Sequence, residues 1–141
     1  MPTQLEISQF LRDAFPQTKC TVESVGAMGD VGDMRATVRH SIGTDELRPG
    51  GTVSGPVLMT TADVALYVAI LGQIGIVPLT VTTSLNINFL RKPAADRDII
   101  GKCTLIKLGK TLAVGEVQLF SEGLPDMVAH VTGTYAIPPK K

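Results

Sequence analysis

A run of apolar residues with helical spacing extends from Ser54 to Gly72 and is the longest of its kind in the chain. Ser54 can serve as the N-cap of a helix, and Pro56 suits the first turn, where its missing N–H would have had no helical partner. Gly72 and Gly75 mark the end of the pattern. Side chains at steps of three and four residues form one apolar face: Leu58, Ala62, Ala65, Leu66, Ala69 and Gly72. The pattern predicts a long buried helix around which the rest of the chain is organised.

The predicted helix carries a second line of side chains, and one of them is charged. Met59, Asp63 and Tyr67 follow one another at steps of four residues, so a lone carboxylate lies about two turns into an otherwise apolar helix. Such a carboxylate can be satisfied by a neighbouring hydroxyl, for example that of Thr60, or it can serve as a catalytic group. The pattern by itself leaves both interpretations of Asp63 open.

Around this helix the sequence changes to alternation of apolar and polar residues, which is typical of strands with one buried face. Residues 4–15 have helical spacing and are followed by Pro16, so a short helix precedes the first strand. Residues 44–53 contain three helix- and strand-breaking residues and predict a loop. The predicted strands cover residues 19–27, 33–40, 80–90, 98–108, 111–121 and 127–137, with turn signals at 29–33, 109–110 and 122–126.

Residues 80–90 alternate most strictly. One face would carry Val81, Thr83, Leu85, Ile87 and Phe89, and the other Thr80, Thr82, Ser84, Asn86 and Asn88. The first face should be buried against the helix. Thr82 would then point away from the helix, and it would reach Asp63 only through a β-bulge or from the end of the strand.

The order of elements predicts an α+β fold in a single domain of residues 1–141. A helix, two strands, a loop, a long helix and four strands follow one another without βαβ alternation or an internal repeat. An antiparallel sheet of about six strands can hide its apolar face by curving around the one long helix. This arrangement is the hotdog fold.

Composition and charge exclude several classes of function. The chain has 13 basic and 13 acidic residues and 44% hydrophobic residues, so it offers no electrostatic argument for binding nucleic acid or an anionic membrane. The apolar run VALYVAILG is too short to cross a bilayer, and the N-terminus has no secretory pattern. Cys20 and Cys103 are interpreted as free, structural thiols of a cytoplasmic protein. His40 and His130 lie far apart without a cluster of carboxylates, so we expect no metal site.

Three blocks of the sequence together resemble the phenylacetic-acid-degradation type of hotdog acyl-CoA thioesterase. They are RPGGTVSGPVLMTTADVALY, TTSLNINFLRKPA and KLGKTLAVGEV, in the order and spacing of that family. In the family the helix usually opens with His-Gly-Gly and carries an aspartate eight residues after the first glycine. Here Ser54, Gly55 and Pro56 stand at the opening, and Asp63 falls on the catalytic position. A family asparagine shortly before the helix is replaced by Arg48.

The resemblance implies roles for further residues. Thr82 matches a Ser or Thr that helps to hold the attacking water in some members. Thioester hydrolysis also needs donors for the oxyanion, and the N–H of Gly55 at the start of a helix can supply one, whereas Pro56 has none to give. Glycine can equally stand at a helix start for steric reasons alone. The predicted catalytic residues are therefore Asp63, Gly55 and Thr82.

Family members build their active sites across a dimer and often pair dimers into tetramers, so the resemblance implies a homodimer with shared sites and a homotetramer. Coenzyme A would be part of the substrate, and no separate cofactor is expected. Arg91 and Lys92 follow one strand and Lys107 and Lys110 flank a hairpin, where basic residues can bind the nucleotide or simply be solvated. The predicted substrate-binding residues are Arg48, Ser54, Met59, Tyr67, Arg91, Lys92, Lys107 and Lys110.

The sequence thus predicts a cytoplasmic acyl-CoA thioesterase that acts on a small molecule and in which Asp63 is a base or a nucleophile. An alternative from another class is a hotdog module that binds acyl-CoA without turnover, as a sensor or carrier, because residues beside the site depart from the family pattern. A hotdog hydratase or dehydratase would want a histidine near the helix, and Ser54 occupies that position.

Overall fold

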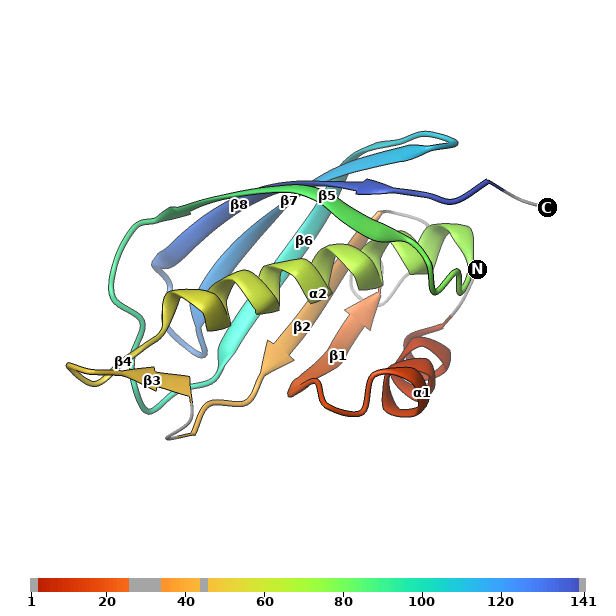
Figure 1. The fold of residues 1–141 in the computed structure, drawn as a ribbon. Helices are drawn as coiled ribbons and strands as arrows, with labels where there is room; N and C mark the ends of the chain where they lie inside the picture. Colours follow the sequence, from red (N-terminus) through yellow and green to blue (C-terminus); the bar gives the residue numbers. More distant parts are fainter. Residues whose placement is uncertain (1–2, 26–33, 44–45, 140–141) are drawn as a thin grey trace.

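A computed structural model describes residues 3–25, 34–43 and 46–139 of the chain. Six strands form one antiparallel sheet in the order β1-β2-β6-β7-β8-β5. The long helix α2 lies in the hollow of this curved sheet, and α1 packs at its β1 edge (Figure 1). The helices and main strands are α1 Gln4–Ala14, α2 Gly55–Ile74, β1 Cys20–Val25, β2 Arg35–His40, β5 Val81–Phe89, β6 Ile99–Leu108, β7 Leu112–Ser121 and β8 Met127–Ala136. The predicted α+β hotdog fold is confirmed.

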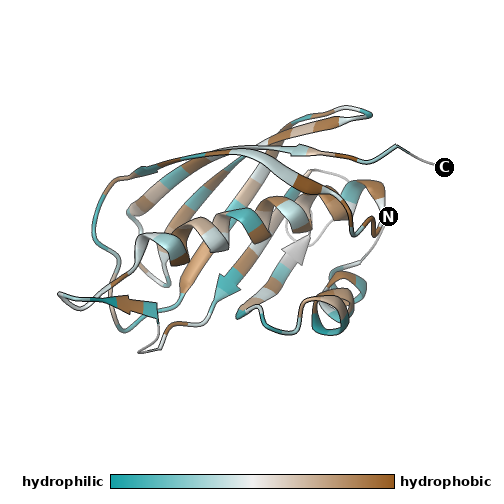
Figure 2. Cartoon of the chain, viewed as in Figure 1, coloured by the Kyte–Doolittle hydropathy of each residue, from teal (hydrophilic) through white to brown (hydrophobic). Residues whose placement is uncertain are grey.

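Helix α2 supplies the centre of the hydrophobic core. Every residue of its predicted apolar face is buried, and so are Val64, Val68, Ile70 and Leu71. The strands that surround it alternate between hydrophobic and hydrophilic positions (Figure 2), with the apolar residues of β6, β7 and β8 facing the helix. The helix continues to Ile74 and is capped by Gly75, whose φ is +96°. The prediction that Gly72 marks its end is wrong, because Gly72 is a buried residue within the last turns.

Glycines on two neighbouring strands let α2 approach the sheet closely. Gly115 of β7 and Gly133 of β8 are directly opposite each other in the ladder. A Cβ atom at Gly115 would lie 2.7 Å from Cδ2 of Leu66, and one at Gly133 would lie 2.5 Å from Cδ1 of the same side chain. Leu66 itself is fully buried. The two glycines therefore form the seat of Leu66, and they set the distance between the middle of α2 and the sheet.

Helix α1 packs against β1, at one edge of the sheet. A capping box joins Thr3 and Glu6 at its N-terminus, where each side chain accepts a hydrogen bond from the backbone N–H of the other. Its buried residues Ile7 and Leu11 belong to the common core. The helix thus closes the side of the fold next to β1 and lies close to α2.

Several predicted elements differ in detail. The predicted turn at residues 29–33 lies outside the described residues. Within residues 44–53, predicted as a loop, Leu47–Arg48 and Thr52–Val53 form a two-stranded antiparallel hairpin, β3 and β4. Its turn contains Gly50 and Gly51, both with positive φ. The backbone can turn back there because glycine has no Cβ to clash.

The prediction that β5 has one buried face is wrong for the single chain. Leu85 and Ile87 are half-buried, but Val81 is 52% and Phe89 56% exposed. The cause is topological, because β5 is an edge strand and, within the described part of the chain, pairs only with β8. A sheet edge leaves one side of its ladder and the flanking side chains without a neighbour.

The argument that the apolar run is too short to cross a bilayer does not hold for the whole of α2. Helix α2 has 20 residues and is long and apolar enough to cross a bilayer by length and composition. Most of it is buried against the sheet, as the core helix of a hotdog fold must be.

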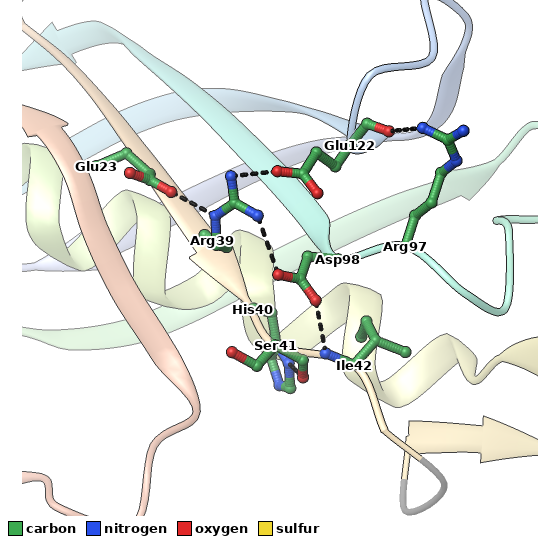
Figure 3. A network of polar contacts seen from close by, with 8 residues as sticks. All are labelled: Glu23, Arg39, His40, Ser41, Ile42, Arg97, Asp98 and Glu122. Carbon is green, nitrogen blue, oxygen red and sulfur yellow. Dashed lines mark hydrogen bonds and ion pairs between the residues drawn. The ribbon is translucent and has the colours of Figure 1, made fainter.

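A network of polar contacts centred on Arg39 connects β1, β2, the start of β6 and the end of β7 (Figure 3). The guanidinium of Arg39 on β2 donates to Glu23 Oε1 of β1 at 2.5 Å and to Asp98 Oδ2, just before β6, at 3.0 Å. It also forms an ion pair with Glu122, which follows β7. Asp98 Oδ1 accepts a further hydrogen bond from the backbone N–H of Ile42 at 3.0 Å. Burial by itself raises the pKa of Asp98, but these hydrogen bonds outweigh it and hold that pKa below its usual value.

We predict that Gly133→Ala destabilises the fold by about 1–3 kcal/mol, because the added methyl group overpacks the seat of Leu66. Urea denaturation measures the free energy of unfolding. Gly43→Ala is the matched control, since its new Cβ would meet only the Glu46 side chain at 3.5 Å. A Gly133→Ala variant as stable as the control would show that the seat is not tightly packed.

We also predict that the cost of Arg39→Met depends on pH. The lowered pKa of Asp98 stabilises the fold above the ordinary carboxyl pKa of about 3.9, and this contribution is lost as the pH falls through the folded value. The difference in unfolding free energy between wild type and variant should therefore shrink from pH 7 to pH 3. Arg97→Met is the control, because Arg97 Nη1 donates to the carbonyl oxygen of Glu122. An equal Arg39→Met difference at both pH values contradicts the interpretation.

Candidate active site

The carboxylate of Asp63 is bound by two hydroxyl groups. Thr82 Oγ1 of β5 and the hydroxyl of Tyr135 on β8 each lie 2.6 Å from Asp63 Oδ1. The Tyr135 hydroxyl also lies 2.8 Å from the backbone carbonyl oxygen of Asp63. Charge-assisted hydrogen bonds of this length are among the stronger ones in proteins. The site therefore joins the middle of α2 to the two strands that cover it.

Thr82 reaches Asp63 through a β-bulge. The register between β5 and β8 shifts between Thr82 and Ser84, while Leu85 and Ile87 beyond the bulge keep the inward orientation. The extra residue reverses which face Thr82 presents, since successive side chains of a strand point to opposite sides. The prediction that strict alternation places Thr82 on the outer face is wrong. The stated condition for a contact with Asp63, a bulge or a strand end, is met.

Tyr135 was not among the predicted site residues. It is only 3% exposed and lies directly opposite Thr82 in the β5–β8 ladder. Burial first, and then the neighbouring charge of Asp63, raise the pKa of its hydroxyl. The alternation along β8, where Val131 and Gly133 are also buried, could have indicated that Tyr135 faces inward. A tyrosine on an inward face must find a partner for its hydroxyl, and a lone helix carboxylate is a suitable one.

Asp63 lies in the wall of an open pocket of about 410 Å³. Tyr67 stacks on Tyr135 with 6.2 Å between ring centroids, and Phe10 of α1 lies 6.3 Å from Tyr67. The hydroxyl of Tyr67 donates to the carbonyl oxygen of Pro78 at 3.1 Å. The pocket lining thus combines a carboxylate with aromatic side chains, one of them from α1.

A second hollow of about 330 Å³ lies at the N-terminus of α2. Its lining includes Arg48, Gly55, Phe89, Arg91 and Lys92. The N–H of Gly55 is the first of the helix and has no partner within it, and the positive end of the helix dipole lies there. A Cβ at Gly55 would lie 3.3 Å from Cζ of Phe89, so the small residue also serves a steric need. The arrangement suits a negatively charged or strongly polarised oxygen.

The predicted site residues therefore separate into two groups within one chain. Asp63, Tyr67 and Thr82 line the first pocket, whereas Gly55 lies in the second hollow together with three predicted binding residues, Arg48, Arg91 and Lys92.

The remaining predicted binding residues lie elsewhere. Ser54 is the N-cap of α2, but its side chain forms no capping hydrogen bond with a described residue. Met59 is exposed on α2 one turn before Asp63, and it lines neither hollow. Lys107 and Lys110 are exposed at the β6–β7 hairpin, outside both hollows. Arg91 forms an ion pair with Asp126 on the surface, with 3.6 Å between Nη1 and Oδ2.

The cysteines and histidines occupy structural positions. Both thiols are free and buried, and burial raises the pKa of Cys20 to about 11 and that of Cys103 further. A buried thiol with a raised pKa is a poor nucleophile. His40 is buried, with Nδ1 2.9 Å from the carbonyl oxygen of Ser41. His130 lies 3.3 Å from Glu116 across the β7–β8 ladder, a partner that the linear sequence did not reveal.

Comparisons with known proteins agree with this fold. The family model described as the thioesterase superfamily matches residues 50–127. A candidate thioesterase from Silicibacter sp. has 40% identity, with 97% of this chain and 92% of that chain covered and a TM-score of 0.84. Zebra fish thioesterase superfamily member 2 has 20% identity, 98% and 100% coverage and a TM-score of 0.79. The E. coli PaaI protein from the phenylacetic acid degradation operon has 18% identity, 95% and 92% coverage and a TM-score of 0.72. No curated protein matches the chain.

The chain has a hotdog fold with a carboxylate on its central helix, and the family model matches more than half of its length. These two findings define the class of protein to which it belongs. The chain belongs to the thioesterase superfamily, and this membership supports a thioester hydrolase. Solved PaaI proteins share its fold, which agrees with the PaaI-like resemblance of the sequence.

Proposed function

We propose that the protein hydrolyses acyl-coenzyme A thioesters, with Asp63 as the general base. The observation that carries this proposal is the Asp63 carboxylate, which is held by two hydroxyl donors in the wall of an open pocket. A general base must lie within hydrogen-bond reach of the water that it activates. Asp63 meets this requirement because it borders the pocket from the middle of a rigid, buried helix.

In the proposed reaction, Asp63 takes a proton from water while the water oxygen bonds to the thioester carbonyl carbon. The carbonyl oxygen becomes an oxyanion and is stabilised by an N–H at a helix start. The carbon–sulfur bond then breaks, and the protonated Asp63 returns its proton to the leaving thiolate. The products are a carboxylic acid and free coenzyme A, and the carboxylate of Asp63 is regenerated.

One chain cannot supply both the base and the oxyanion donor. Gly55 and Asp63 are eight residues apart on α2, which places them roughly 12 Å apart along the helix axis. They line different hollows, whereas a reacting carbonyl needs each group within about 3 Å. We therefore propose a homodimer in which the two α2 helices run antiparallel, so that Gly55 of one copy meets Asp63 of the other.

The edge strand β5 supports this pairing. Its free side and its neighbourhood expose large apolar residues that would be costly to leave in water: Leu79, Val81, Phe89, Leu90 and Met59. A two-fold axis beside β5 would cover them and make the pairing antiparallel. The exposed ends of β5 then become part of an interface, which accounts for an apolar pattern that the single chain does not bury.

The same pairing would gather the predicted basic residues. Cross-strand partners run from Ala113 through Tyr135 to Thr82, so the β6–β7 hairpin with Lys107 and Lys110 lies at the Thr82 end of the sheet. Arg91 and Lys92 lie at the opposite end of β5. Antiparallel pairing brings Arg91 and Lys92 of one copy toward the Thr82 end of the other copy, where Lys107 and Lys110 lie. The basic residues of both copies would there face the phosphates of coenzyme A.

We predict that Asp63→Asn keeps the fold and lowers kcat by at least about a hundredfold, because the amide cannot accept the proton from water. A panel of acyl-CoAs, with the released thiol as the readout, measures the rate. Thr132→Val is the control and should leave kcat unchanged, since Thr132 lies at an exposed position of β8. Binding of acyl-CoA without turnover by the wild type would favour a sensor or carrier instead.

A second prediction concerns the shared site. Asp63→Asn and Gly55→Pro chains, each inactive alone, should recover roughly a quarter of wild-type activity when unfolded and refolded together in equal amounts. Half of the dimers are then mixed, and each mixed dimer holds one intact site and one site with both defects. Gly55→Ala is the control that keeps the N–H while crowding Phe89. No recovery in mixtures with proven heterodimers would exclude a site shared in this way.

A further inference from the structure

The carboxylate of Asp63 is held unequally at its two oxygens. Both hydrogen bonds that it accepts from side chains, from Thr82 and from Tyr135, end on Oδ1. Among the described residues, no donor to Oδ2 is found. A carboxylate oxygen has about two acceptor sites, so two short hydrogen bonds occupy Oδ1. Oδ2 keeps its lone pairs for another partner.

Both donors approach Asp63 from the sheet. Thr82 and Tyr135 are cross-strand partners on β5 and β8, and the bulge after Thr82 brings its hydroxyl to the same side as the tyrosine. Tyr135 is buried, which fixes the position of its ring, and its neighbour Tyr67 stacks against it. The two strands thus hold Oδ1 at a defined place and set the rotation of the carboxylate about its Cβ–Cγ bond.

The tyrosine has only one hydrogen to donate, and two acceptors lie within reach. The Asp63 carbonyl oxygen, at 2.8 Å, belongs to a helix and already has a partner four residues further on, whereas Oδ1, at 2.6 Å, carries charge. A charged acceptor forms the stronger hydrogen bond. The hydroxyl hydrogen of Tyr135 therefore points to Oδ1, and the phenol oxygen remains close to the helix backbone.

We propose that Tyr135 is a positioning residue that, together with Thr82, fixes Oδ1 of Asp63 so that Oδ2 alone accepts the proton from the attacking water. This inference rests on the proposed function and extends it. The ring of Tyr135 borders the pocket, but in this scheme its hydroxyl donates to Asp63 and binds neither the water nor the substrate. It acts on the chemical step by holding the base in one rotamer, and it has little influence on the binding of acyl-CoA.

The inference predicts a separation of kcat from KM. Tyr135→Phe keeps the ring in the core and removes the hydroxyl, so kcat should fall about tenfold while KM for acyl-CoA stays within about twofold. Thr82→Val should act in the same direction, and Thr82→Ser, which keeps a hydroxyl, should recover most of the wild-type kcat. Because each donor alone still holds Oδ1, the double variant should lose more than the product of the single effects.

The Asp63→Asn background distinguishes positioning from general support of the fold. If Tyr135 acts through the carboxylate, Tyr135→Phe should leave the residual rate of an Asp63→Asn enzyme unchanged. If it only supports the fold, the residual rate should fall by the same factor as in the wild type. Thr132→Val, which removes a hydroxyl from an exposed position of β8, is the matched control and should leave kcat unchanged in both backgrounds.

Each outcome of this experiment decides the inference. A wild type that hydrolyses acyl-CoA with Tyr135→Phe at full kcat would refute the positioning role alone. Loss of rate by the same factor in the Asp63→Asn background would also refute it. A wild type without any hydrolysis would refute the proposed function and this inference together. If Tyr135→Phe does not fold, as checked by circular dichroism, the comparison of Thr82→Val with Thr82→Ser decides the role of the Oδ1 contacts.

Discussion

The close packing of one apolar helix into a curved sheet is the constraint on which the rest of this structure depends. Leu66 of α2 sits between Gly115 and Gly133, where any side chain on the sheet would collide with it. This contact lies one turn from Asp63 on the same helix. The same close approach that fills the core therefore brings the carboxylate within hydrogen-bond distance of Tyr135, two residues beyond Gly133 on β8.

Burying most of a helix around a carboxylate requires compensation for the lost hydration of its charge. Thr82 and Tyr135 provide it on one oxygen of Asp63, a residue that also borders the pocket. The Arg39 network meets the same need in another way at the far end of the sheet, where several carboxylates surround one guanidinium. That network holds four strands together and stands apart from the pocket, so it supports the fold.

The features of β5 link the fold to assembly. It is an edge strand, its bulge turns Thr82 toward α2, and its ends expose Val81 and Phe89. The departures from the family pattern, Arg48, Ser54 and Pro56, lie at or shortly before the start of α2, and Arg48 shares a hollow with Phe89 of β5. Asp63 and the start of α2 lie in different hollows, which is why the proposed function includes a second copy.

The apolar spacing of α2, the alternation of the strands and the position of Asp63 could all be predicted from the sequence, because periodicity records which face of an element must be buried. The role of Tyr135 could not, since its contact joins residues that are 72 positions apart. The side to which Thr82 points depended on a bulge, and a bulge is decided by how two strands pair. The separation of Asp63 from Gly55 along α2 follows from their spacing in the sequence and the rise of a helix. Which other residues line the hollow around each of them came from the tertiary structure, because local patterns contain no information on which distant surfaces meet.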